Sequence, residues 1–445
     1  MNRRKFLAVS AMALGAPAWL PAAPATKPNI IFILADDVGL DGVGCYGSDD
    51  FKDLTPNIDE LARTGLRLAT CCSMPLCGPS RFCINSGRYG FRTGAIANTR
   101  VGNKAAEEYP LARLLKEGGY ATCMAGKWLH SGEMPDVWGF DEWIGATTTI
   151  GWYWEKTYKR NGHDIRLDSE QYMPDVYHDF AMDFMRRNKQ GPFFLYYATH
   201  LVHTPIVRTP DSKPEAKEHY FDNIAYLDKL VGKIGDEVDR LGIRENTVIV
   251  FAGDNGTAKA AQQWVSNTIH GRKISGAKGS LLEGGVRAPL IVNWKGTTAA
   301  GTTCEDLVDF SDFYPTFAEL AGIPMPKSLV FDGRSLVPQL RGEAGNPRDW
   351  VFVQSQIFGP ELHGWYVRER RWKLDNSGRL YDLRDAPFTE PIVAADSNEP
   401  DAIAARKRLQ AILDSLNPAA GKVFAPGEAK AGKRKNSDAK SKGVE

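Results

Sequence analysis

One uninterrupted apolar stretch constrains the fold of this chain more than any other part of its sequence. Residues Asn29 to Ala35 read NIIFILA, and Asp36 and Asp37 follow them directly. A short strand that is apolar on both faces is typical of the centre of a parallel sheet covered by helices. Ligands of such sheets bind beyond the carboxyl ends of the strands, so this acidic pair could hold a hard cation. The alternative is a solvated loop, which would normally carry a single acid and a glycine.

Further apolar strands alternate with amphipathic helices as far as residue 322. The predicted strands are 120–125, 192–197, 247–252 and 289–294, and the predicted helices are 56–65, 109–119, 175–188, 220–241 and 310–321. Thr55 and Pro56 predict the N-cap and first position of the first helix. This alternation indicates an α/β fold with a large, mostly parallel sheet flanked by helices. Short strands after residue 350 and a helix over 401–416 predict a small C-terminal antiparallel subdomain.

Several of these strands end in polar groups, which a parallel sheet would gather at one edge. Asp254 and Asn255 follow the strand over 247–252, and with Asp36 and Asp37 they supply oxygen donors suited to Ca²⁺ or Mg²⁺. The cations expected there are Arg81, Lys127 and Lys278, and the candidate proton-transfer groups are His130, His200 and His203. A divalent ion and fixed cations together would bind a tetrahedral anion and stabilise charge as its ester bond breaks.

The stretch Cys77-Gly78-Pro79-Ser80-Arg81 places a thiol beside an arginine at a predicted helix start. Such a thiol would have a lowered pKa and would be reactive. Taken in isolation, the same stretch describes a buried cysteine next to a turn, since free cysteine is among the most buried residue types. The strand-end residues favour a third role, in which Cys77 is the nucleophile or its precursor.

The N-terminus predicts export. Arg3, Arg4 and Lys5 precede an apolar run to Leu20 and a small-x-small cleavage site at 23–25, which together indicate a signal peptide of the twin-arginine type over residues 1–25. The apolar run is too short for a comfortable membrane span, so no stable membrane insertion is expected. The seven cysteines are odd in number, so at least one cannot pair within the chain, and no CxxC pair suggests zinc.

The charge distribution argues against nucleic acid as a partner. The net charge is +1, of which the signal segment contributes three and residues 427–445 a further net three, so the body of the protein carries −5. A nucleic-acid-binding domain would present a broad basic surface instead. Between residues 145 and 172 an insertion carries Trp152, Lys156 and Arg160, and its aromatic residues either cap the core or form a wall for stacking sugars.

From these residues the chain resembles the formylglycine-dependent sulfatases, which have an alkaline-phosphatase-like fold. The resemblance covers about residues 28–416, and its most specific part is Cys77-x-Pro79-Ser80-Arg81 followed by Ser86-Gly87-Arg88. It implies that a formylglycine-generating maturation enzyme converts Cys77 to Cα-formylglycine, whose hydrate attacks sulfur. It also implies a sulfuric ester hydrolase that releases inorganic sulfate.

The resemblance further implies a role for each site residue. The metal, Ca²⁺ with Mg²⁺ as an alternative, would be held by Asp36, Asp37, Asp254, Asn255 and the modified Cys77. Arg81, Lys127 and Lys278 would bind sulfate oxygens, and His203 would protonate the leaving group. His200, His270 and Arg272 are candidates for contacts with the substrate, expected to be a sulfated carbohydrate. The family commonly has histidine where Leu129 stands here, so His130 is the displaced candidate for that catalytic position.

Two other functions fit the same residues. One is hydrolysis of a phosphate or phosphonate ester, as in other members of the superfamily, and the other is glycan binding without catalysis. The predicted domain organisation is a signal peptide (1–25), a catalytic α/β domain (26–325), a C-terminal α+β subdomain (326–416) and a basic, disordered tail (417–445).

Overall fold

A computed structural model describes residues 27–98, 102–130, 132–146, 153–154, 157–166, 170–356 and 363–422. The predicted signal peptide and the tail beyond residue 422 lie outside the described residues, as do Trp152 and Lys156. Within the described part of the chain, no helix combines the length and apolar character that crossing a membrane would need.

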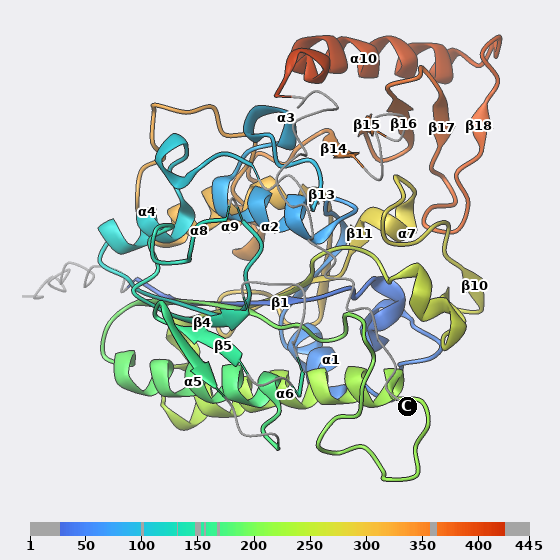
Figure 1. Cartoon of the computed structure of the whole chain (residues 1–445). Helices are drawn as coiled ribbons and strands as arrows, with labels where there is room; N and C mark the ends of the chain where they lie inside the picture. Colours follow the sequence, from blue (N-terminus) through green and yellow to red (C-terminus); the bar gives the residue numbers. More distant parts are fainter. Residues whose placement is uncertain are drawn as a thin grey trace, which may run out of the picture.

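An eleven-stranded mixed sheet forms the middle of the molecule (Figure 1). Its strands in spatial order are β11 (Arg287–Ala288), β2 (Leu66–Cys72), β12 (Leu290–Trp294), β8 (Thr247–Gly253), β1 (Asn29–Ala35), β7 (Phe193–Ala198), β3 (Ala121–Lys127), β4 (Glu142–Ala146), β5 (Thr157–Arg160) and β6 (His163–Arg166), with β13 (Thr302–Asp309) paired to β2. The apolar stretch that opens the chain is therefore a central strand, parallel to both β7 and β8. All seven of its residues are buried.

The alternating side chains of β1 enter two separate hydrophobic cores, one on each face of the sheet. Ile30, Phe32 and Leu34 pack in the core beneath α2 (Cys77–Ser86), α4 (Leu111–Glu117) and α8 (Phe313–Leu320). Ile31 and Ile33 pack on the other face, against α1 (Pro56–Arg63), α5 (Met173–Asn188) and α6 (Tyr220–Arg240). Both faces are covered by helices, which explains why β1 is apolar on both sides after Asn29, whose side-chain amide donates to Thr247 Oγ1 at 3.2 Å.

A second, antiparallel sheet follows in the C-terminal part of the chain. It consists of β14 (Val351–Gln356), β15 (His363–Arg368), β16 (Trp372–Asp375), β17 (Leu380–Asp382) and β18 (Ile392–Val393), and α10 (Pro400–Leu416) covers it (Figure 1). Leu409 and Leu413 of α10 belong to the same core as Val351 and Phe352. The C-terminal sheet therefore shares one continuous hydrophobic core with the face of the large sheet that α2, α4 and α8 cover.

Three details differ from the sequence predictions. The strand over 289–294 is β12, which runs antiparallel to β8, and β2 and β13 were not predicted. Part of the insertion between 145 and 172 forms the hairpin β5–β6, which extends the large sheet from β4. The apolar pattern of a sequence does not show whether a strand runs parallel or antiparallel to its neighbour. Contacts between distant segments of the chain therefore decide these strand pairings.

The start of α1 at Pro56 is as predicted, but a side chain from another helix caps it. Thr55 is the N-cap residue, but its Oγ1 accepts a hydrogen bond from Gly44 N at 2.8 Å and does not cap the helix. Instead, the Asp228 carboxylate on α6 accepts hydrogen bonds from Ile58 N at 2.8 Å and Asn57 N at 3.2 Å. A carboxylate at a helix N-terminus satisfies unpaired N–H groups and opposes the positive end of the helix dipole.

Candidate active site

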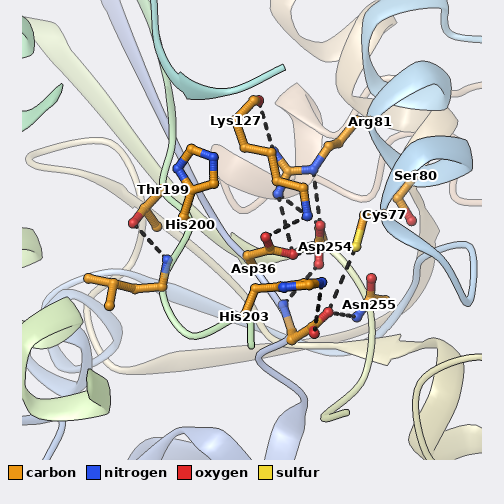
Figure 2. Close-up of polar contacts among 12 residues, drawn as sticks. Asp36, Cys77, Ser80, Arg81, Lys127, Thr199, His200, His203, Asp254 and Asn255 are labelled. Carbon is orange, nitrogen blue, oxygen red and sulfur yellow. Dashed lines mark hydrogen bonds and ion pairs between the residues drawn. The ribbon is translucent and has the colours of Figure 1, made fainter. Parts of the chain in front are cut away.

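The carboxyl ends of β1, β2, β3, β7 and β8 lie at one edge of the large sheet, because these strands run in the same direction. Each is followed there by side chains predicted for the site: Asp36 and Asp37 after β1, Cys77 beyond β2, Lys127 in β3, His203 beyond β7, and Asp254 and Asn255 after β8. Figure 2 shows Asp36, Cys77, Lys127, His203, Asp254 and Asn255 converging from separate segments of the chain.

Cys77 is the first residue of α2 and is almost completely buried, with 1% of its surface exposed. Gly78 N donates to Asn98 Oδ1 at 2.8 Å, and the Ser80 hydroxyl accepts from Met74 N at 3.1 Å, so both sides of the turn are held. Cys77 Sγ donates to Asp36 Oδ1 at 3.3 Å. Burial, with the nearby Asp254 charge, raises the pKa of the Cys77 thiol well above its ordinary value. The prediction of a thiol with a lowered pKa is therefore wrong.

Three buried aspartates and one asparagine form the oxygen-rich part of the site. Asp37 N donates to Asp254 Oδ1 at 3.1 Å, and Asn255 Nδ2 donates to Asp37 Oδ1 at 2.8 Å. Ligand atoms of Asp36, Asp37, Cys77 and His203 all lie within 4.8 Å of one another. Asp37 has a φ of 62°, a left-handed conformation that is uncommon outside glycine and is concentrated at functional sites.

The donors present fit a hard divalent cation. Asn255 Oδ1 is buried without a hydrogen-bond partner, although its Nδ2 is fully engaged by Asp37 and Gly256 O. A buried amide oxygen left unpaired is costly unless another ligand satisfies it. Carboxylate oxygens with an amide oxygen are the donors preferred by Ca²⁺ and Mg²⁺.

Three cations balance the three carboxylates. Lys127 Nζ lies 2.5 Å from Asp36 Oδ2, Arg81 Nη2 lies 2.8 Å from Asp254 Oδ2, and Lys278 Nζ lies 2.5 Å from Asp37 Oδ1. Burial would raise the pKa of Asp254, but Arg81, Lys127 and Lys278 together lower it below its ordinary value. The site therefore gathers three cations around three carboxylates, so its formal charges balance without a bound ion.

His203 reaches the same cluster. Its Nε2 lies 3.8 Å from Asp37 Oδ2, and its Nδ1 lies 2.6 Å from the backbone oxygen of Thr204. The contact through Nδ1 fixes the ring orientation and leaves Nε2 facing the cluster. Its side chain is 22% exposed, so it contacts both the buried carboxylates and the solvent side. A histidine in this position can transfer a proton to a group bound in the site.

Comparisons with known proteins agree with this geometry. The sulfatase family model matches residues 28–323, and a model of the C-terminal part of N-sulphoglucosamine sulphohydrolase matches residues 277–410. The chain is 34% identical to dog N-acetylgalactosamine-6-sulfatase, over 84% of this chain and 76% of the relative. The chain belongs to the sulfatase family. It is therefore a sulfuric ester hydrolase, as the resemblance predicted.

Two further relatives support the same assignment. Human arylsulfatase A is 32% identical to this sulfatase, over 79% of the chain and 75% of the relative. The crystal structure of Ps i-CgsB in complex with k-i-k-neocarrahexaose superposes with a TM-score of 0.76 at 26% identity, covering 88% of this chain and 93% of that one. The predicted alkaline-phosphatase-like fold, with a large, mostly parallel sheet and a C-terminal antiparallel sheet, is thereby confirmed.

The sulfatase does not place His130 at the cluster. The His130 ring stacks on Trp128 with centroids 3.9 Å apart and also contacts Phe82 and Trp138. Burial, reinforced by the Arg81 charge, lowers the pKa of His130 to about 3. The side chain that lies beside the start of α2 is that of Leu129, whose Cδ2 is 3.2 Å from the position a Cβ would take on Gly78. The geometry therefore gives no support for a catalytic His130, because the ring is held inside an aromatic cluster.

His200 is also unsuited to the predicted contact with substrate. The residue is fully buried, and its ring stacks on Tyr177 with centroids 5.5 Å apart. Burial and the neighbouring Lys127 and Arg81 charges lower the pKa of His200 well below its ordinary value. Of the two histidines on this loop, only His203 combines contact with the cluster and exposure to solvent.

The other two predicted substrate contacts, His270 and Arg272, lie on the surface. Arg272 pairs with Asp385 at 2.6 Å and its guanidinium covers the Phe388 ring at 4.1 Å, while the His270 ring packs over Gly47. Among the described residues, no contact joins either side chain to the carboxylate cluster. Their role in substrate binding therefore has no support from the geometry.

Sequence reasoning missed the residues that hold the Lys278 loop in place. Glu283, just after this loop, is buried and pairs with Arg368 at 2.8 Å and Arg287 at 3.0 Å. Glu283 N also donates to Glu390 Oε1 at 2.7 Å. The C-terminal sheet thus anchors the segment that supplies Lys278. Asn98, which holds the start of α2, was missed as well, because no local pattern marks a residue that acts through a distant backbone group.

Proposed function

We propose that this sulfatase is exported and releases sulfate from a sulfated carbohydrate, using formylglycine at position 77 and a divalent metal ion. The observation that carries the proposal is the buried cluster in which Cys77, three aspartates, Asn255 and three cations meet. Named relatives act on sulfated sugars by their printed names, as in N-acetylgalactosamine-6-sulfatase, which supports the substrate class. The signal segment at residues 1–25 supports export.

The proposed metal ligands are Asp36, Asp37, Asp254, Asn255 and residue 77. The oxygen donors suit either Ca²⁺ or Mg²⁺, and Ca²⁺ is proposed first because the family resemblance implies it. When bound, the ion supplies positive charge that polarises the sulfate ester. Its charge would also offset the three aspartates, each of which is paired with one of the three cations. Those cations would then be available to bind an anionic substrate.

The protein groups then have separate roles. Arg81, Lys127 and Lys278 bind the sulfate oxygens and stabilise the charge that develops in the transition state. His203 donates a proton through Nε2 to the departing sugar oxygen. Formylglycine at position 77, as its hydrate, would supply the oxygen that attacks sulfur as the sugar oxygen departs. The second hydroxyl of the hydrate would then expel inorganic sulfate and restore the aldehyde. The burial of the cluster excludes bulk water and strengthens each of these interactions.

The same proposal assigns parts of the chain. Residues 26–325 form the catalytic unit, residues 326–416 form the subdomain that anchors the Lys278 loop, and residues 417–445 form a basic tail. A formylglycine-generating enzyme is the required maturation partner. Mass spectrometry of the peptide containing Cys77 tests that step, because a matured protein shows loss of the thiol and gain of an aldehyde. Release of sulfate from a panel of sulfated sugars tests the substrate class, and release from none of them by matured protein would refute it.

Replacement of His203 should make the rate depend strongly on the leaving group. We expect His203→Ala to lower kcat by about 100-fold for a sugar sulfate, whose alcohol needs a proton to depart. For 4-nitrophenyl sulfate, a good leaving group, the loss should stay below about tenfold. The measurement is kcat for both substrates, with His219→Ala as the matched control because His219 pairs with Asp222 on the surface. Equal losses on both substrates would contradict a proton-donor role.

Removal of metal should inactivate the enzyme reversibly. After chelation and dialysis we expect kcat to fall at least about 100-fold, because charge stabilisation by a metal contributes several kcal/mol. Ca²⁺ should restore the activity, and comparison with Mg²⁺ identifies the preferred ion. Elemental analysis of the dialysed protein serves as the control, and full activity in protein shown to contain no metal would exclude the proposed site.

A further inference from the structure

A cavity of about 800 Å³ adjoins the reaction centre. Leu76 and Asn98 line one part of it, and Lys278 lines another. Leu76 immediately precedes Cys77, Asn98 accepts the hydrogen bond from Gly78 N, and Lys278 Nζ lies 2.5 Å from Asp37. Three lining residues are therefore tied directly to the reacting groups, and a substrate held at the cluster would extend into this space.

Two more cations line the same cavity, Lys259 from the short 3-10 helix η5 (Lys259–Gln263) and Lys273 from β10 (Arg272–Lys273). Both are exposed, and neither pairs with a carboxylate of the described residues. The cations of the cluster differ, because each of them already faces a buried aspartate. Cations without counter-ions in a concave site create a local positive potential that attracts an anion.

Strands β9 (Thr268–Ile269) and β10 form a hairpin, and the two residues of β10, Arg272 and Lys273, point to opposite sides of it. Successive side chains of a strand point to opposite faces. Arg272 accordingly turns to Asp385 and Phe388, whereas Lys273 lines the cavity. The pattern of the strand thus assigns Lys273, not Arg272, to the substrate side.

The remaining wall of the cavity suits a sugar ring. Leu76 and Ile274 offer apolar surface, and Gln262 offers an amide. Gly279 leaves open space, since a Cβ there would meet no atom within 4 Å. Apolar surface with a few polar groups is typical of a site that binds a small organic ligand and fixes its orientation.

We propose that Lys259 and Lys273 bind a second anionic substituent of the substrate, a sulfate or a carboxylate carried by the sulfated sugar or its neighbour. The inference rests on the proposed function, because it places the scissile sulfate at Arg81, Lys127 and Lys278. The preferred substrate is then an oligosaccharide with at least two negative charges. The sulfatase would discriminate against sugars that carry a single sulfate and no other charge.

Competitive inhibition tests this site without requiring turnover of any sugar. Turnover of 4-nitrophenyl sulfate is measured in the presence of three disaccharides: one with a single sulfate, one with two sulfates, and one with a sulfate and a uronic acid carboxylate. The readout in each protein is the ratio of the Ki of the singly charged sugar to that of a doubly charged one. The proteins are the matured wild type, Lys259→Ala, Lys273→Ala and, as the matched control, Arg272→Ala.

We expect a ratio of about 10 or more in the wild type and a fall to about 1–3 in either lysine variant, as for the loss of a charge-assisted contact. The Arg272→Ala ratio should stay at the wild-type value. The two doubly charged sugars show whether the second sulfate or the carboxylate is preferred. A wild-type ratio near 1 for both sugars, or an equal fall in Arg272→Ala, would overturn the inference. Failure of the proposed function has a different signature, namely turnover of the aryl sulfate with no sulfate released from any sugar.

Discussion

Replacing Cys77 by alanine should lower kcat for sulfate release by about 10⁴-fold or more, the loss expected when a covalent nucleophile is removed. The side chain lies at the centre of the cluster, 3.3 Å from Asp36 Oδ1, and no other cysteine of the chain belongs to it. Burial raises the pKa of the unmodified Cys77 thiol well above its ordinary value, which disfavours a thiolate nucleophile and is consistent with the proposed modification. Initial rates with 4-nitrophenyl sulfate and a sugar sulfate measure the loss.

Cys83→Ala is the matched control for this experiment. Cys83 lies on the same helix, is equally buried and packs in the hydrophobic core away from the cluster. We expect this variant to lose some stability, as for any small cavity in a core, but to retain its kcat. Thermal unfolding of both variants separates loss of catalysis from loss of fold. A Cys77→Ala protein that keeps substantial activity would remove Cys77 from the mechanism.

Replacing Arg348 by leucine should lower the free energy of unfolding by about 3–5 kcal/mol, because it leaves buried carboxylates without their counter-ion. Arg348 Nη1 lies 2.9 Å from Asp309 Oδ2, and its Nε donates to Asp312 Oδ2 at 2.9 Å. Tyr89 completes the network by donating to Asp309 at 2.7 Å. The arginine thus joins the end of β13 to the segment that leads into the C-terminal sheet.

Thermal unfolding measures this loss, and the midpoint should fall by roughly 4–6 °C for a chain of this size. Arg63→Leu is the matched control, since the Arg63–Glu60 pair is exposed on α1 and should contribute less than about 1 kcal/mol. A similar midpoint for the two variants would show that the buried network does not stabilise the fold. The kcat of folded Arg348→Leu should match that of the wild type, because the network does not touch the cluster.

Much of the site could be predicted from sequence because its signals are local. The apolar run before Asp36, the strand before Asp254 and the helix start at Cys77 each specify their own conformation through neighbouring residues. Parallel strand direction then brings their ends together, which is a general property of the fold class. The structure places Asp36, Asp37, Cys77, Arg81, Lys127, Asp254, Asn255 and Lys278 together as expected.

Tertiary structure decided the choices that depend on distant residues. His200 and His203 are three residues apart on one loop, yet Tyr177 covers one ring and the other reaches Asp37. The His130 ring packs in an aromatic cluster, and some members of that cluster, such as Phe82, are distant from it in sequence.

The same holds for the surface and for helix ends. Arg272 and Lys273 are adjacent, but the position of Asp385 and the pleat of β10 send them to different sides. The start of α1 is capped by Asp228, 170 residues away from Ile58. Sequence thus determined which groups stand at the ends of the strands. Burial and side-chain direction arise from contacts between segments far apart in the chain, so only the folded structure could determine which of those groups meet.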